Sequence, residues 1–359
     1  MPIKYIFTAD DFGPIDFINR GINILVKQGI INSVQVFGNT DRVKLKKELA
    51  TLYNHIPEGN SLDIGIHLTL SSGKPLFKKQ NKSIKETWGK MVSKKNGEYY
   101  FKKYSRFYFP IIDDNNSDYI DTIAIELKTQ VETLGEIINE VNTENDSQKL
   151  IYNSASCHHN LYLTSEKLFS VFLNSLNYKD RILKVRSPRT IPHRKDESYF
   201  NFVLPLFNFS DRKEHRKAMT DLTDALAKGK YPTVSGKSIL TPHTTDILFY
   251  KSLGSLMVGK ISKSKIESRK RKFHEMINRQ HDTFNNPIVE FIFHVGFGTE
   301  KINKEITQGY LGVNHKYFDN RMIEYHSLID LKLSNKLNGT FKSITSWEKC
   351  DNIRFEGIA

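Results

Sequence analysis

The chain has 359 residues, of which 38% are hydrophobic and 26% are charged, and its formal net charge is +13. This length and apolar content allow a large buried core, in one big α/β domain or two smaller ones. Its two cysteines, Cys157 and Cys350, exclude a disulfide framework and favour a reducing compartment. No apolar run approaches the roughly 20 residues needed to span a bilayer, and the start does not resemble a signal peptide. We therefore expect a soluble, cytoplasmic protein.

The positive charge is concentrated in lysine-rich stretches such as 77–86 and 259–272. A basic chain favours anionic partners, but charge bears on association and not on fold. The second stretch is typical of the solvated start of a helix, and the sequence has neither zinc-finger spacing nor an aromatic RNA-binding signature. We expect no nucleic-acid partner.

Strand-like and helix-like stretches alternate along the first seventy residues. The patterns predict strands over 3–9, 32–38 and 61–70, with helices over 15–27 and 41–53 between them. Strand periodicity is clearest in the third segment, where Ile64, Ile66 and Leu68 alternate with Gly65 and His67. This regular alternation indicates βα units.

The region from 71 to about 117 breaks the rhythm, and we expect a long excursion that caps a site. Regularity then returns, with a helix predicted over 119–141, a strand over 149–156, a helix over 165–176 and a strand over 181–186. Later elements are predicted as helices at 212–228, 266–284 and 320–333 and strands at 286–295 and 341–347. No internal repeat or low-complexity linker is present, so we expect one domain over 1–348 with an insertion at about 76–118, and a tail over 349–359.

Side chains suited to catalysis fall where the predicted strands end. Asp10 and Asp11 close the first strand, and His67 lies near the end of the third. The fourth strand is followed by the pair His158 and His159, the fifth ends at Arg186, and the late strand ends at His294. The carboxyl ends of the strands gather on one face of a parallel barrel, which is where such folds keep their active sites.

Each of these residues also has a structural explanation. Asp10 and Asp11 could cap the next helix, His67 and His294 could be hydrogen-bonded core residues, and the histidine pair could form a turn. Their coincidence at strand ends favours a site. Two histidines and one carboxylate are a familiar metal-ligand set, and a second carboxylate could take the proton from an attacking water. One aspartate of the pair would then hold the metal and its neighbour the proton.

Five segments together resemble the YdjC-like carbohydrate deacetylases, the family that includes chitooligosaccharide deacetylase. They are TADDFG (8–13), DIGIHLTLSSGKPL (63–76), ASCHHNLYL (155–163), KVRSPR (184–189) and EFIFHVGF (290–297). The resemblance extends from about residue 3 to residue 348, with extra length at 78–118 and before 286.

The resemblance implies a seven-stranded βα barrel, a distorted relative of the TIM barrel, that removes an acetyl group from an N-acetylated amino sugar. It implies one divalent ion, zinc or magnesium, held by Asp11, His67 and His158. Asp10 would be the general base, His294 the general acid that protonates the leaving amine, and Arg186 the cation that keeps Asp10 ionised. The catalytic set is thus Asp10, His294 and Arg186.

Two departures from the family pattern leave alternatives open. Tyr162 stands where another histidine is expected, and Val295 replaces a proline. A one-residue shift in alignment would place Cys157 at the third ligand position and His159 two places later. A catalytically degenerate homologue that binds glycans or acts as a scaffold is the alternative function. A phosphoester hydrolase is disfavoured because only one cation, Arg186, is expected at the site.

Other candidates receive minor roles. His243 and Asp246 could contact substrate, whereas His215, His274 and His281 lie on predicted helices among charges and fit a solvated face. The aromatic cluster at 99–109 could stack on sugar rings or pack the insertion onto the barrel.

Overall fold

The computed structural model describes residues 4–102, 117–158, 161–162, 166–179, 181–186, 233–234, 237–238, 247–249, 288–298, 321–322, 324–326, 328–329 and 346–347. Within these residues no helix is both long and apolar enough to cross a membrane.

The elements at the start of the chain confirm the predicted βα alternation. They are β1 (Lys4–Phe12), α1 (Asp16–Lys27), β2 (Ser33–Val36), α2 (Arg42–His55) and β3 (Leu62–Leu68). Helix α1 ends where Gly29 adopts a φ of 66°, a conformation that glycine takes without a Cβ penalty. Helix α2 is capped by Asp41, whose side chain accepts a hydrogen bond of 3.0 Å from the backbone N–H of Lys44.

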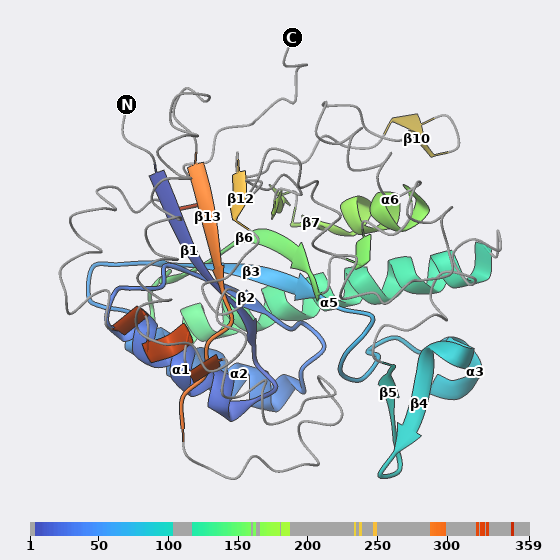
Figure 1. Ribbon diagram of the computed structural model, residues 1–359. Coiled ribbons are helices and arrows are strands. Elements are labelled where there is room, and N and C mark those ends of the chain that lie inside the picture. Colours follow the sequence, from blue (N-terminus) through green and yellow to red (C-terminus); the bar gives the residue numbers. More distant parts are fainter. Residues whose placement is uncertain are drawn as a thin grey trace, which may run out of the picture.

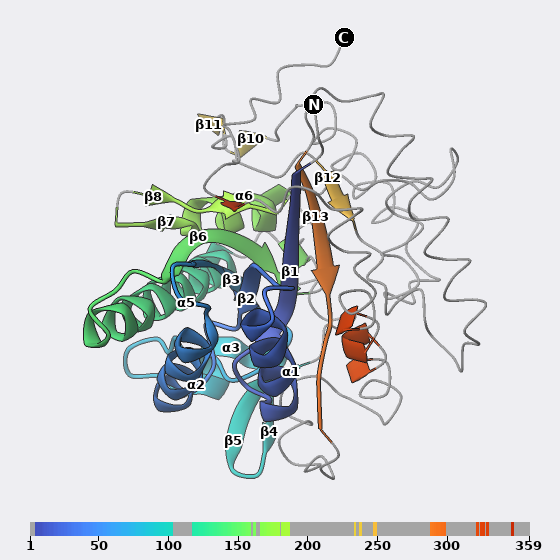
Figure 2. The same cartoon turned by 90° about the vertical axis from the view of Figure 1, so that its left-hand side faces the viewer.

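The excursion after β3 forms a small lobe as far as it is described. It contains α3 (Ile84–Trp88), the 3₁₀ turn η1 (Gly89–Met91) and the hairpin β4 (Val92–Lys95) and β5 (Glu98–Phe101). The buried Trp88 packs edge-on against Phe101, with ring centroids 4.9 Å apart, and its Nε1 donates to the carbonyl of Phe77. The hairpin projects away from the sheet in both views (Figures 1 and 2). A capping role for this region stays a prediction.

The next segment follows the prediction until residue 176 and then departs from it. Helix α5 (Ser117–Glu144), strand β6 (Leu150–Cys157) and helix α6 (Glu166–Ser175) are present as expected. The predicted strand over 181–186 is divided. Its first part, β8 (Arg181–Ile182), pairs antiparallel with β7 (Asn177–Tyr178), and only β9 (Lys184–Val185) joins the main sheet beside β6.

The late part of the chain adds β10 (Thr233–Val234), β11 (Lys237–Ser238), β12 (Ile247–Phe249) and β13 (Ile288–Phe293). Strand β13 confirms the predicted apolar strand, whereas β12 was not predicted. The described residues between 321 and 329 are helical, in agreement with the helix expected there. The helices predicted at 212–228 and 266–284, and residues 341–345 of the last predicted strand, lie outside the described residues.

Seven strands form one parallel sheet in the order β12-β13-β1-β2-β3-β6-β9. Helices α1, α2 and α5 lie along one side of this curled sheet (Figures 1 and 2). The predicted α/β class is therefore confirmed. Closure of the sheet into a barrel would require contact between β12 and β9, and no such pairing occurs among the described residues.

The two faces of the sheet differ in chemistry although both are buried. On β3, Ile64, Ile66 and Leu68 belong to the apolar core, whereas Asp63 and His67 point to the opposite face. That opposite face carries polar side chains from four further strands: Asp10, Gln35, Ser154, Ser156 and Glu290. The alternation in the sequence thus separates an apolar face under helices from a polar face.

At the amino end of the polar face, a late segment of the chain packs against the sheet. Trp347 is fully buried against Ile6, and its backbone N–H donates to the carboxylate of Asp63 at 2.6 Å. Its indole Nε1 donates to Ser33 at 3.2 Å, and Asn153 donates to Asp63 at 2.6 Å. Residues almost 300 positions apart thereby close this end of the polar face.

Candidate active site

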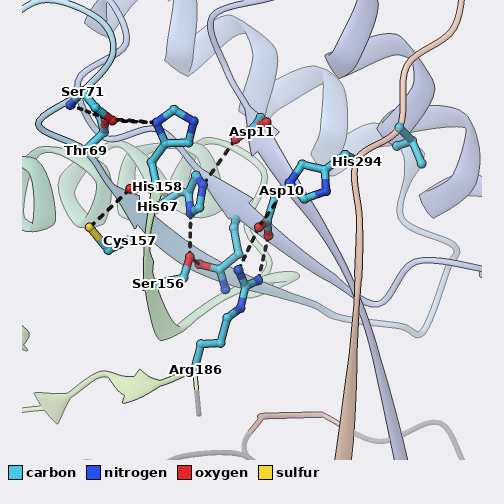
Figure 3. Close-up of polar contacts among 12 residues, drawn as sticks. Asp10, Asp11, His67, Thr69, Ser71, Ser156, Cys157, His158, Arg186 and His294 are labelled. Atoms are coloured by element: carbon cyan, nitrogen blue, oxygen red, sulfur yellow. Dashed lines mark hydrogen bonds and ion pairs between the residues drawn. The ribbon is translucent and has the colours of Figure 1, made fainter. Parts of the chain in front are cut away.

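The adjacent carboxylates Asp10 and Asp11 lie near the end of β1. In a regular strand two successive side chains point to opposite faces. Here the pairing of β1 with β2 shifts register between Ala9 and Phe12, and Asp11 has a left-handed φ of 70°. This bulge lets both carboxylates point toward the same group of side chains (Figure 3).

Neither aspartate caps the following helix. The N-cap position of α1 is Ile15, which makes no side-chain capping bond. The turn between β1 and α1 is instead held by Asn19, whose amide bonds both the N–H and the carbonyl of Gly13. The helix-cap explanation of the aspartate pair is therefore wrong.

Asp10 is clamped by a buried guanidinium. Arg186, directly after β9, donates Nη1 to Asp10 Oδ2 at 2.8 Å and Nη2 to Asp10 Oδ1 at 2.7 Å. Its Nε and Nη2 also donate to Glu290 of β13 at 3.1–3.2 Å. Burial alone would raise the pKa of Asp10, but the charge and hydrogen bonds of Arg186, together with the nearby imidazoles of His67 and His294, outweigh burial and the pKa is lowered. Asp10 therefore stays ionised at neutral pH.

Asp11 has a different set of partners. Its Oδ2 is bound by the buried guanidinium of Arg321, and its Oδ1 lies 3.3 Å from His67 Nε2. Burial would raise the pKa of Asp11, yet the Arg321 guanidinium, helped by the nearby imidazoles of His67 and His158, holds that pKa well below its usual range. The two neighbouring carboxylates thus have different closest partners: Arg186 binds Asp10, whereas Arg321 binds Asp11 and His67 lies beside it.

The imidazoles of His67 and His158 stand beside each other, with ring centroids 5.5 Å apart, and the edge of Phe37 packs against both. Each ring has a hydroxyl at Nδ1, from Ser156 at 2.7 Å for His67 and from Ser71 at 3.1 Å for His158. Both rings are therefore oriented through Nδ1, with Nε2 on the opposite edge (Figure 3).

His294 follows β13 and lies on the far side of Asp10 from Arg186 (Figure 3). Its Nε2 is 4.0 Å from Asp10 Oδ2, and its side chain is 42% exposed. Desolvation by the surrounding protein, assisted by the Arg321 cation, lowers the pKa of His294 against the opposing pull of the two aspartates. The His294 side chain is thus partly exposed and adjacent to the Asp10 carboxylate.

The donor chemistry of Asp11, His67 and His158 fits a divalent metal ion. Neighbouring ligands in a tetrahedral zinc site with bonds near 2.1 Å are about 3.4 Å apart, and the His67 Nε2 to Asp11 Oδ1 distance is 3.3 Å. Nevertheless, within the described part of the chain no three His, Cys, Asp or Glu side chains are grouped tightly enough to form a ready-made site. Asp11 and His67 are therefore separated by a distance that suits two ligands of one ion, and the ring of His158 lies next to that of His67.

The structure thus brings together all six residues that the sequence singled out: Asp10, Asp11, His67, His158, Arg186 and His294. The alternative alignment receives no support from Cys157, because burial raises the pKa of its thiol to about 12 and its Sγ contacts the carbonyl of His158. Tyr162 stacks on Phe172 of α6, with centroids 4.4 Å apart, and so belongs to the core. His159, His215, His243, Asp246, His274 and His281 lie outside the described residues.

Three site residues were missed. Arg321 lies on a helix with no local signal and meets Asp11 from 310 positions away. Glu290 had a visible signal, because it is the single polar residue in the apolar strand IVEFIF, and Gln35 had a weaker one, as a polar residue between two valines in SVQV. A polar side chain buried in a strand needs partners, so both could have been added to the predicted site.

The fold and the cluster define an α/β protein with a curled parallel sheet whose carboxyl ends hold two carboxylates, three imidazoles and two guanidinium groups. Residues 4–140 match the family model described as "YdjC-like protein". The resemblance expected from the sequence is confirmed over this region.

Several curated relatives named carbohydrate deacetylase are similar to this chain. The protein of Vibrio vulnificus (strain CMCP6) is 37% identical over 79 residues, or 22% of this chain and 29% of that protein. The protein of Listeria welshimeri is 39% identical over 75 residues, or 21% and 28%, and that of Clostridium beijerinckii is 37% identical over 76 residues, or 21% and 29%. The chain thus spans less than a third of the length of these relatives.

One solved structure is similar over almost the whole chain. It is a protein of Enterococcus faecalis V583 described as a "putative cellobiose-phosphate cleavage protein", with 18% identity, a TM-score of 0.53, and coverage of 97% of this chain and 98% of that one. At this identity the likeness supports the fold alone.

Proposed function

We propose that the protein is a carbohydrate N-deacetylase, which hydrolyses the acetamide of an N-acetylated amino sugar. The observation that carries this proposal is the placement of Asp10 between Arg186 and His294, next to the Asp11 and His67 pair. The relatives named carbohydrate deacetylase support it. We propose with it that the curled sheet is part of a distorted seven-stranded barrel.

Asp10 and His294 would carry the two proton transfers. Water adds to the acetyl carbon and gives a proton to Asp10, which Arg186 holds ionised and oriented. The carbon–nitrogen bond then breaks as the sugar nitrogen takes a proton from His294, and the proton that Asp10 received passes to His294, which restores both groups. Acetate and a free amino sugar result. The 4.0 Å between His294 Nε2 and Asp10 Oδ2 supports this pair of roles, because one small substrate group could reach both side chains.

Asp11, His67 and His158 would hold one divalent ion, zinc or magnesium. When bound, such an ion supplies Lewis-acid polarisation of the water and of the acetamide oxygen. The chain's own contribution is to keep Asp11 ionised through Arg321 and to direct both imidazoles through the hydroxyls of Ser156 and Ser71.

The test is acetate release from a panel of N-acetylated sugars, chitooligosaccharides and nucleotide sugars, with chelator and with zinc or magnesium restored. Metal content is measured on the wild type and on His67→Ala. We expect acetate from at least one substrate, abolished by chelator, and loss of the metal in His67→Ala. Absence of both activity and metal across the panel would contradict the proposal and favour a non-catalytic glycan-binding homologue.

A further inference from the structure

A buried amide lies behind the metal-ligand candidates on the polar face of the sheet. Gln35 of β2 is fully buried, and its side chain crosses over β3 to reach β6. Its Nε2 donates to Ser154 Oγ at 3.1 Å, and its Oε1 accepts from Ser156 Oγ at 2.8 Å. The crossing requires the glycine at position 65, because a Cβ there would come within 2.1 Å of Gln35 Nε2. The local sequence therefore makes room for this amide.

These contacts constrain the protons of the neighbouring histidine. A serine hydroxyl has a single hydrogen, and Ser156 gives it to Gln35. Toward His67 Nδ1, 2.7 Å away, Ser156 can then only accept. The proton of a neutral His67 consequently belongs on Nδ1, which leaves a lone pair on Nε2. That lone pair faces Asp11 Oδ1 at 3.3 Å, and two acceptors facing each other favour a cation between them.

We propose that Gln35, acting through Ser156, is a positioning residue that keeps the proton of His67 on Nδ1 and so reserves Nε2 for a metal ion shared with Asp11. The inference rests on the proposed function, since it assigns His67 to the metal. Gln35 would contact neither the metal nor the substrate. The predicted position of the His67 proton can be measured in the metal-free protein and therefore does not depend on turnover.

The first measurement is the tautomer of His67 in metal-free protein, read from long-range ¹⁵N–¹H spectra of ¹⁵N-histidine-labelled samples at a pH of about 8, where an ordinary histidine is neutral. His67→Gln identifies the signal. We expect Nδ1–H in the wild type and in Gln35→Glu, because a carboxylate also accepts from Ser156. In Gln35→Met the acceptor is lost, Ser156 turns its proton to His67, and the Nε2–H form should dominate.

The second measurement is Zn²⁺ affinity by competition with a chromophoric chelator. We expect Gln35→Met and Ser156→Ala to bind Zn²⁺ about 10- to 100-fold more weakly than the wild type, as is usual when a ligand's hydrogen-bond partner is lost. Gln35→Glu should restore most of the affinity. Ser154→Ala is the matched control: it removes a buried hydroxyl from the other side of the same amide without touching His67, and its affinity and tautomer should match the wild type.

Each result decides between distinct claims. An Nε2–H tautomer in the wild type, or an unchanged tautomer in Gln35→Met, overturns the positioning role. Equal Zn²⁺ losses in Ser154→Ala and Gln35→Met would reduce Gln35 to a packing residue. If the expected tautomers are found but the wild type binds no Zn²⁺, the effect of Gln35 on His67 through Ser156 is upheld and the metal-dependent function is contradicted.

Discussion

The two ends of the polar face each contain buried aspartates, but these are held in opposite ways. At the amino end, Asp63 receives hydrogen bonds from Asn153, Ser346 and the backbone of Trp347. At the carboxyl end, Asp10 and Asp11 are bound by arginine side chains. Among the contacts of the described residues, the same residue type, equally buried on the same sheet, accepts from neutral donors at one end and from cations at the other.

This difference distinguishes a carboxylate that stabilises the fold, Asp63, from the two carboxylates of the candidate site, Asp10 and Asp11. Neutral donors fix a carboxylate in place and link distant segments of the chain, which stabilises the fold. Cations in a buried setting also set the protonation state, as the lowered pKa values of Asp10 and Asp11 show. We therefore expect substitutions at the carboxyl end to change activity more than stability, and substitutions at the amino end to do the reverse.

The largest effect is expected for two matched substitutions, one at each end of the polar face, which test this division between activity and stability. Asp10→Asn removes the proposed base and should lower acetate release about 10²- to 10⁴-fold, while metal content stays at the wild-type level. Asp63→Asn makes the same chemical change at the other end and should leave turnover per folded molecule near that of the wild type. Its unfolding free energy should fall by about 1–3 kcal/mol, because its donors lose their charged acceptor. Similar activity losses in both variants would remove the distinction between the two ends.

The next effect concerns the segment that closes the amino end. Trp347→Ala should lower the unfolding free energy by about 3–5 kcal/mol, since it empties a fully buried site. Trp347→Phe, which keeps most of the volume and loses only the bond to Ser33, should cost about 1 kcal/mol. Urea denaturation measures both, with metal content as the control for the carboxyl end. Loss of metal in folded Trp347→Ala would show that the ends are coupled.

A further buried carboxylate, Glu126, tests the same contrast through the pH dependence of stability. Glu126 of α5 accepts from the backbone N–H groups of Leu76 and Phe77 and from Gln130, all neutral donors. Burial outweighs these bonds and raises the pKa of Glu126 to about 7. The folded state therefore holds this proton more tightly than the unfolded state, so the stability it contributes is present at low pH and is lost as pH rises from about 4.5 to about 7.

The loss of unfolding free energy over that range should approach 3 kcal/mol, because a tenfold difference in proton affinity between the folded and unfolded states corresponds to about 1.4 kcal/mol. It is measured by urea denaturation at the two ends of the pH range, in the wild type and in Glu126→Gln. The wild type should lose more stability than the variant on going to the higher pH. Equal changes would mean that neutral donors alone suffice to keep this carboxylate ionised.

The sequence predicted the fold well where local periodicity and pairing agree. Strands β1, β2 and β3 have short apolar runs bounded by turns, and helices α1, α2 and α5 are long enough for their patterns to be clear. Prediction failed at β12, which has only three residues, and at 181–186, where one apparent strand is shared between a hairpin and the main sheet. Strands this short are defined by the neighbours they pair with and carry little periodicity of their own.

The site was predictable to the extent that its residues follow strands. Asp10, His67, Arg186 and His294 could be grouped because parallel strands align their carboxyl ends. Arg321 could not, since its partner Asp11 is distant in the chain and a helical arginine is ordinarily a surface residue. The hydrogen-bonded series from Gln35 through Ser156 to His67 depends on strands β2, β3 and β6 lying side by side, and the pattern of residues along the sequence does not show which strands are neighbours.

The bulge at Asp11 has a consequence for protein design. A regular strand end presents one functional group per face, so a base and a ligand would ordinarily need two strands. Here one extra residue in a left-handed conformation lets a single strand supply both carboxylates, the proposed base and the proposed ligand, to one face. Anyone grafting this aspartate pair onto an idealised barrel would have to graft the irregularity with it, because straightening the strand would turn Asp11 into the apolar layer beneath the helices.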